Sequence, residues 1–355
     1  MSLERQLTFW VAALVIFAAL LWLLSPVLLP FIAGMALAYL LDPLTRRVER
    51  TGLGRGLSAL IVIAVIIVMV VLVISLVAPI LADQLFAFVD NIPKYMDRLQ
   101  ALISGSNREW LNKIFGAQAG DPGRSVGGLV AQGASWLAAF LVSLWSGGRA
   151  LVSVFSLLVI TPVVAFYLLC DWERLVATVD GWIPVQQRET VRGLACEMDV
   201  AIAGFVRGQA VICLILGVFY AIGLTLCGLH FGFLIGFGTG VMSFIPFVGA
   251  LTGFVVAGGV AVAQFWPDWS SILMVVGVFA VGQVLEGYFL TPNLVGKRVG
   301  LHPVWLMFAL LAFGYLFGFV GLLVAVPLAA AIGVLIRFAL RQYLASPLYT
   351  GGGPR

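Results

Sequence analysis

The chain has 355 residues, of which 62% are hydrophobic and only 10% are charged, and its formal net charge is +4. Its mean hydropathy of +1.11 exceeds that of water-soluble globular proteins, so the composition excludes a soluble domain and indicates an integral membrane protein. The basic residues cluster beside apolar stretches. This placement indicates charge that sets membrane orientation, and it speaks against a nucleic-acid partner.

Long stretches without Asp, Glu, Lys or Arg account for most of the chain. They run from Arg5 to Asp42, Arg55 to Asp83, Arg149 to Asp171, Arg207 to Asp268, Asp268 to Glu286, and Arg298 to Arg337. At about 20 residues per crossing, these stretches hold about eight transmembrane helices. We therefore expect an all-α, polytopic membrane protein.

Residues 1–82 are expected to form the first three membrane helices. The first two, over 8–24 and 27–41, are predicted to make a tight hairpin around Pro26 and Pro30. Proline lacks the N–H donor that a continuing helix needs, so the chain is expected to turn there.

A dense basic loop over residues 46–55 belongs in the cytoplasm by the positive-inside tendency. The third span, over 57–81, then leads outward, and the insertion at 83–149 is predicted to be extracytoplasmic. Its first half places Leu85, Phe88, Val89, Ile92, Met96, Leu99 and Ile103 at helical spacing. This amphipathic helix could lie on the membrane or on a neighbouring subunit, or it could form a helical cap on its own chain.

The second half of the chain alternates in the same way between membrane helices and amphipathic segments. The fourth membrane helix is predicted over 150–170, and a cytoplasmic amphipathic helical segment over 171–207 runs into the fifth. Residues 208–345 are expected to form the fifth to eighth membrane helices and the transport core, and residues 346–355 a flexible tail.

Two glycine-rich runs in this core are too long for one straight crossing. The first, 231–267, has 37 residues and would measure about 55 Å as a helix, against a hydrocarbon core of about 30 Å. The second, 299–336, faces the same problem. Pro246 and Pro327 are expected to break these helices, with Gly249 beside the first break. Each run either crosses the membrane or folds back as a re-entrant hairpin.

The two runs also share a short motif. "FGFLIGF" at 231–237 is matched by "FGYLFGF" at 313–319. The match indicates either an internal repeat, which in transporters marks the binding site, or a chance similarity in a chain rich in Gly and Phe. Glycines at four-residue spacing lie on one helix face and let another helix approach closely. The glycines with this expected packing role are Gly232, Gly236, Gly240, Gly314 and Gly318.

The residue types needed for catalysis or metal binding are scarce. The only histidines are His230 and His302, both in predicted turns, so neither a zinc motif nor a Ser-His dyad has its parts. We expect no enzyme activity, no catalytic residue, no metal site and no cofactor.

Glu286, at the end of the seventh span, is the most informative ionisable residue, and Gln283 lies one turn before it. A carboxylate at membrane depth costs on the order of 3 kcal/mol on insertion scales, so such groups usually face a partner or a water path. Glu286 could bind a proton or cation, or it could lie at the headgroup level. The candidate substrate- or ion-binding residues are Glu286, Gln283, Asn293, Ser243, Arg207 and Gln209. For the last two, the alternative is that they anchor the start of the fifth span.

Several motifs occur together and in order: "PFIAGMALAYLLDPL", "FYLLCDWERL", "FVRGQ", "FIPFVG", "LTPNLVGKRVGLHP" and "FGFVGLLVAVPLAA". With them the chain resembles the autoinducer-2 exporter family, also called the PerM-like permeases, from Pro30 to Ala331. The resemblance implies a bacterial inner-membrane transporter with eight helices, in a family associated with autoinducer-2 export and, for some members, with sodium/proton antiport. The chain departs from the commoner family pattern at Ser243 and Gly287, where asparagine is frequent.

We therefore expect a secondary transporter that exports a small polar metabolite or a signalling molecule such as autoinducer-2, as a homo-oligomer. The expected partners are the lipid bilayer, a small-molecule substrate and a proton or sodium ion. One alternative is a sodium/proton antiporter. Another is a non-transporting membrane scaffold or sensor that uses the insertion at 83–149 as its binding module.

Overall fold

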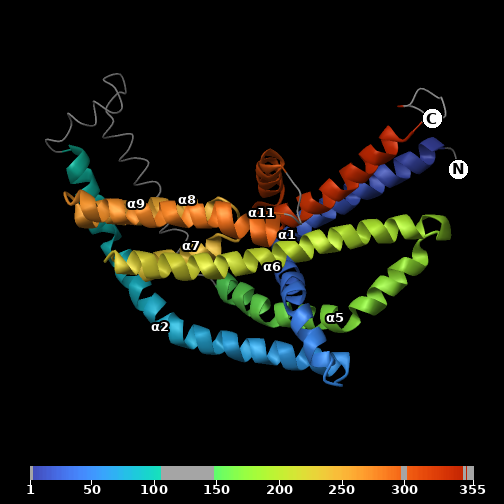
Figure 1. Ribbon diagram of the computed structural model, residues 1–355, viewed down its shortest axis with the longest axis horizontal. Helices are drawn as coiled ribbons and strands as arrows, with labels where there is room; N and C mark the ends of the chain where they lie inside the picture. The colour runs from blue at the N-terminus through green and yellow to red at the C-terminus, as the bar shows by residue number, and fades with distance from the viewer. Residues whose placement is uncertain (1–2, 105–147, 297–301, 347–348, 350–355) are drawn as a thin grey trace. The chain divides into compact units, whose positions relative to one another are not determined.

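The computed structural model describes residues 3–104, 148–296, 302–346 and 349 (Figure 1). Every regular element in these ranges is a helix, which confirms the predicted all-α class. Most of the insertion predicted at 83–149, the basic pair 297–298 and nearly all of the predicted tail lie outside the described residues.

The chain divides into two compact units. Unit 1 comprises Met1–Ile67, Phe155–Ala210 and Thr291–Arg355, and unit 2 comprises Val68–Val154 and Val211–Leu290. Helices α2 (Arg55–Ser104), α5 (Gly148–Trp182) and α6 (Arg188–Leu226) each contribute residues to both units.

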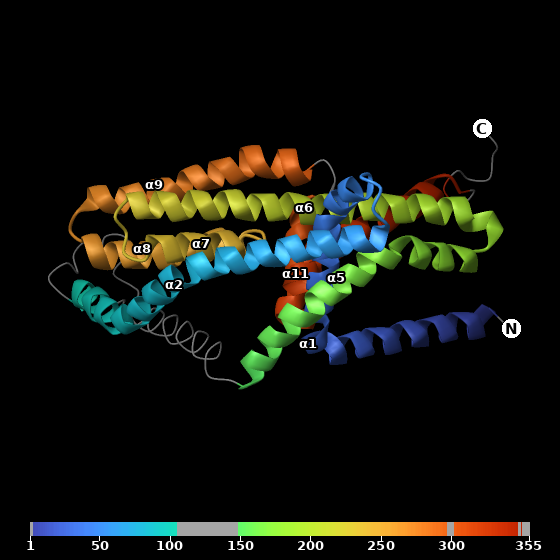
Figure 2. The ribbon, with the colours of Figure 1, turned by 90° about the horizontal axis from the view of Figure 1, so that it is seen from below.

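Unit 1 contains α1 (Leu3–Glu49), on which α11 (Pro303–Leu344) packs. The predicted hairpin at residues 26–30 is wrong, because α1 continues through this segment and only bends along its length (Figure 2). A proline inside a helix removes one hydrogen bond and can kink the helix without ending it.

The core of unit 1 is made by α1, α2 and α5. Its buried members are small and branched apolar residues: Ala38, Leu41, Ala59, Val62, Ile63, Ala165 and Leu169. After α5 and a short 3-10 helix, η1 (Val185–Gln187), α6 runs without interruption from Arg188 to Leu226. The part of the predicted 171–207 segment that starts at Arg188 thus continues as one helix into the residues of the fifth predicted span, whereas residues 171–182 belong to α5.

In unit 2, the first long run forms an antiparallel helical hairpin of α7 (Gly232–Met242) and α8 (Val248–Phe265). A side chain at position 253 would collide with Thr239, and one at position 249 with Ser243. At the other end of the hairpin, the Gln264 side chain accepts a hydrogen bond from the His230 backbone N–H and donates one to the Gly228 carbonyl, both at 2.8 Å.

The chain therefore enters and leaves this hairpin at the same end, as a re-entrant segment would. Pro246 lies in the non-helical connection between α7 and α8. α7 is only 11 residues long, which gives it a length of about 16 Å, too short to cross the hydrocarbon core.

The second long run changes direction at a different place from the one predicted. Within α11 the non-helical residue is Gly318, with φ 59° and ψ −137°, whereas Pro327 lies inside the helix. The Phe313 carbonyl comes up against Gly321, and Gly314 faces the Leu322 side chain, so the chain folds back around Gly318. Glycine permits this bend because it lacks a Cβ atom and adopts positive φ readily.

α9 (Trp269–Val284) follows α8 and packs on it, and two π-helical segments, η2 (Leu285–Leu290) and η3 (Pro292–Gly296), continue the chain. Six helices among the described residues are long and apolar enough to cross a membrane. The protein is thus a polytopic membrane protein, while eight crossings remain a prediction.

Candidate functional site

The close contact between α6 and α7 in unit 2 depends on glycines. A Cβ atom at Gly232 would meet the backbone of Leu224, one at Gly236 the backbone of Ala221, and one at Gly240 the backbone of Gly217. These three glycines therefore let the two helix backbones touch, and they fix α7 against α6.

The non-helical connection between α7 and α8 leaves two helix ends within a segment of apolar residues. Ser243 is 2% exposed, and its hydroxyl donates to the Thr239 carbonyl at 2.8 Å. Phe247 has φ 69°, and no side chain caps the N-terminus of α8. The Val248 N–H at the start of α8 instead donates to the Ile245 carbonyl at 3.2 Å, since the first turn of a helix has no internal partners for its N–H groups.

A groove of about 460 Å³ runs from this break along α8 and α9. Its lining residues are Phe247, Ala250, Leu251, Phe254, Val276, Phe279, Ala280 and Gln283. Seven of these eight are apolar, and Gln283 supplies the single polar side chain. The groove thus suits a small molecule that has apolar surface and a few hydrogen-bonding groups.

Gln283 and Glu286, two of the predicted candidates, meet at the transition from α9 to η2. The Gln283 Nε2 donates to Glu286 Oε2 at 3.3 Å. Tyr220 and Cys213 of α6 lie within electrostatic range of Glu286. Sequence reasoning missed both residues, because they occur in the uncharged C-terminal part of α6, more than 60 positions from Glu286, and no pattern links them to it.

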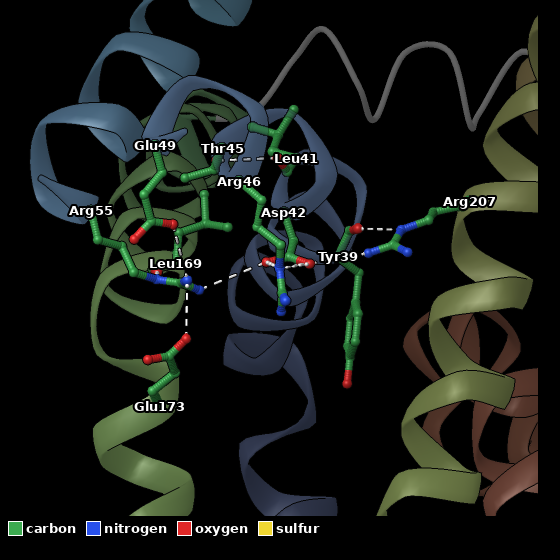
Figure 3. A network of polar contacts seen from close by, with 10 residues as sticks. All are labelled: Tyr39, Leu41, Asp42, Thr45, Arg46, Glu49, Arg55, Leu169, Glu173 and Arg207. Carbon is green, nitrogen blue, oxygen red and sulfur yellow. Dashed lines mark hydrogen bonds and ion pairs between the residues drawn. The ribbon is translucent and has the colours of Figure 1, made fainter. Parts of the chain in front are cut away.

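Unit 1 holds a second polar cluster, which joins α6 to α1 (Figure 3). The Arg207 Nε donates to the Tyr39 carbonyl at 2.7 Å, and Arg207 Nη2 lies 3.5 Å from Asp42. The Tyr39 hydroxyl donates to Asp199 at 2.9 Å. Arg207 is therefore held by α1, and both roles predicted for it, at a cavity mouth or as an anchor of the fifth span, stay predictions.

Arg55, from the first turn of α2, extends the cluster to α5. Its Nε donates to the Leu169 carbonyl at 2.8 Å, and its guanidinium lies 3.2 Å from Glu173, 3.5 Å from Glu49 and 3.7 Å from Asp42. Only 17% of the Arg55 side chain is exposed. Because three carboxylates surround it, its charge stays compensated despite this burial.

The sequence pointed to this ionic cluster only in part. Arg207 was a candidate, and Arg46 and Arg55 belonged to the basic loop that was expected only to set orientation, while Asp42 and Glu173 fall inside the motifs "LLDPL" and "FYLLCDWERL". Arg46 completes the cluster and lies 3.0 Å from Asp42 (Figure 3).

The six residues predicted to bind a substrate or ion are divided between the two units. Ser243, Gln283 and Glu286 belong to unit 2, and the others to unit 1. Within unit 1, the Leu294 carbonyl of η3 lies against Gly208, which brings the segment bearing Arg207 and Gln209 beside the segment bearing Asn293. Gln209 is 4% exposed, while Asn293 is exposed. Among the described residues, no group of three His, Cys, Asp or Glu could hold a metal ion.

Comparison with known proteins points to one family. The protein-family model described as "AI-2E family transporter" matches residues 11–341 of this chain. The chain is 28% identical over 325 residues to YrrI of Bacillus subtilis (strain 168), a candidate transport protein, covering 90% of this chain and 89% of that protein. It is 28% identical over 341 residues to PerM of Escherichia coli (strain K12), a candidate permease, covering 92% of each chain. The protein therefore belongs to the AI-2E family of membrane transporters.

Proposed function

We propose that this transporter is a secondary carrier that exports a small metabolite or signalling molecule, with autoinducer-2 as the first candidate, across the bacterial inner membrane. The observation that carries the proposal is the non-helical connection between α7 and α8, which lies at one end of the groove. Irregular backbone at membrane depth is tolerated only inside protein or beside a water-filled cavity. Broken helices of this kind form the binding sites of many secondary transporters.

The groove limits the class of substrate. Its lining offers apolar contact along α8 and α9 and one carboxamide at Gln283. A strongly charged molecule would lose its hydration there without compensation. A compact molecule with a few hydroxyl or carbonyl groups could instead bond to the Gln283 carboxamide.

Flux through reconstituted protein tests this proposal. Liposomes loaded with autoinducer-2 should show saturable efflux that depends on the protein. Ala280→Phe should lower the efflux at least tenfold, because the added ring fills the groove. Gly277→Phe is the matched control on the same helix, since no atom lies within 4 Å of its Cβ position. Efflux that does not saturate contradicts the carrier, and equal efflux from both variants contradicts the groove as its path.

Proton or sodium coupling is the second candidate function, and the Gln283–Glu286 contact favours it. A half-buried carboxyl at the end of a span can bind a cation and release it on the other side. Glu286→Gln keeps the shape and removes the charge. A coupled carrier with this change should lose the pH dependence of its flux between about pH 6 and pH 8 while still moving substrate. Wild-type pH dependence in this variant would make Glu286 an interfacial anchor.

A further inference from the structure

Tyr220 of α6 presents an unusual combination of burial and missing hydrogen bonds. It is among the largest fully buried side chains, with 0% of its surface exposed. Its hydroxyl makes no hydrogen bond of acceptable geometry with any described residue. Buried tyrosine hydroxyls normally have a partner, because leaving one unpaired costs free energy.

α9 is shaped to receive this side chain. The ring of Tyr220 stacks on Phe279, with centroids 4.9 Å apart and planes 26° apart. One turn further along α9, the missing side chain of Gly282 leaves the space that the end of the phenol ring occupies, since a Cβ atom there would collide with the hydroxyl. The hydroxyl therefore lies at the surface of α9 beside Gly282. The side chain of Gln283 is within interaction range of this hydroxyl.

Gln283 can connect the hydroxyl to Glu286. Its Nε2 already donates to Glu286 Oε2 at 3.3 Å. A carboxamide offers one oxygen acceptor and one NH₂ donor group, so the Gln283 oxygen stays available to accept from a hydroxyl. A chain in which Tyr220 donates to Gln283 and Gln283 donates to Glu286 satisfies all three side chains.

We infer that Tyr220 is a positioning residue for Glu286, because its hydroxyl orients the Gln283 carboxamide so that the NH₂ group faces the carboxylate. This inference deepens the proposed function and rests on Glu286 belonging to the transport site. Proximity to substrate is not required of Tyr220, since it acts through Gln283.

Among the described residues, few other titratable groups lie near Glu286 to disturb a measurement on it. From α6, Cys213 and Tyr220 face it. Helices α7 and α8 contain no Asp, Glu, Lys, Arg or His, and Gln283 is the polar neighbour from α9. If removing the Tyr220 hydroxyl changes the titration of Glu286, the change can therefore be assigned to the path through Gln283.

The test is an infrared titration of the reconstituted protein, which reads Glu286 without any substrate. The carboxyl C=O band of Glu286 is assigned by its loss in Glu286→Gln. Tyr220→Phe keeps the ring stacking and removes only the hydroxyl. We expect it to displace the titration midpoint of this band by about one pH unit, a roughly tenfold change in proton affinity. Gln283→Leu should displace it to the same extent, and the double variant no further, since the two residues act in series.

Tyr288→Phe is the matched control, because Tyr288 lies in η2 near Glu286 with 78% of its surface exposed, and it should leave the midpoint unchanged. An unchanged midpoint in Tyr220→Phe, or additive displacements in the double variant, would overturn the positioning role. The infrared result is independent of flux. If the wild-type protein moves no autoinducer-2, the proposed substrate fails while the titration still decides the role of Tyr220.

Discussion

The two glycine-rich runs contain nearly the same motif, at 231–237 and 313–319, and are built differently. In the first, Gly232, Gly236 and Gly240 face the backbone of α6, and the helix ends at Met242, before Pro246. In the second, the corresponding Gly318 faces open space and is itself the bend, while the proline that follows stays helical.

This difference shows that a glycine motif does not specify one structural role. The same residue type permits close backbone contact in α7, because it lacks a side chain, and a sharp bend in α11, because it tolerates positive φ. The environment of each glycine decides between these roles. Variants at these positions can therefore test the two roles separately.

The largest expected effect is an all-or-none labelling difference that tests the hairpin of the first run. If both ends of the hairpin lie on one side of the membrane, cysteines placed at His230 and at Asp268, in a background without the four native cysteines, react with an impermeant reagent from the same side. The His230 substitution keeps the backbone bond to Gln264. Labelling of the two positions from opposite sides would restore a full crossing between them and rule out the hairpin.

Close packing in the first run predicts the largest loss of stability. Gly236→Leu would place a side chain where the Tyr220 and Ala221 backbone lies, so we expect a loss of about 3 kcal/mol or more, measured by thermal unfolding in detergent. Gly238→Leu on the same helix is the control, because its Cβ position is free of atoms within 4 Å. Equal stability of the two variants would contradict the helix contact.

The bend in the second run predicts a loss of intermediate size. Gly318→Ala should cost about 1–3 kcal/mol although the site is open, because the backbone conformation itself is strained for a residue with a Cβ atom. Pro327→Ala is the comparison, and it should be neutral or stabilising, since alanine suits a helix interior better than proline. A larger loss of stability in Pro327→Ala than in Gly318→Ala would show that the main break of the second run lies at Pro327, as the sequence predicted.

The smallest expected effect concerns the turn that ends the first run. Asp268 accepts from the Ser271 hydroxyl at 2.6 Å and from the Ser270 N–H at 3.0 Å, and these bonds hold the pKa of its carboxyl below the ordinary value of 3.8. A depressed pKa stabilises the folded state above the ordinary value, and this contribution is lost as the pH falls through the lowered one. The stability difference between wild type and Asp268→Asn should therefore be constant above about pH 4 and change only below it. A change near neutral pH would contradict this assignment.

The sequence predicted those features that depend on composition and on local residue chemistry. Long uncharged stretches identified the membrane helices, and Pro246 marked the break in the first run because proline cannot supply the N–H donor. Gln283 and Glu286 were expected on one face because their spacing places them one turn apart. These arguments need no knowledge of tertiary contacts.

The features that could not be predicted depend on distant partners. Gly318 looks like a packing glycine until its φ is known, and Pro26 looks like a turn although α1 continues through it. Tyr220 sits among apolar residues, and its hydroxyl gains a role only from its position beside Gly282 and Gln283, more than 60 positions away. Arg55 likewise reads as a loop arginine until its bond to Leu169 is seen.

The pairing of α6 with α7, α7 with α8 and α8 with α9 has a consequence for how the chain folds. Each of these helices packs against the one that follows it in sequence, so these three contacts need only short loops to close, unlike the contact of α6 with α9. Contacts between sequence neighbours form quickly, since little loop-closure entropy must be lost first. We therefore expect the segment from α6 to α9 to assemble early, as it leaves the insertion machinery, and before α11 has been synthesised to pack on α1.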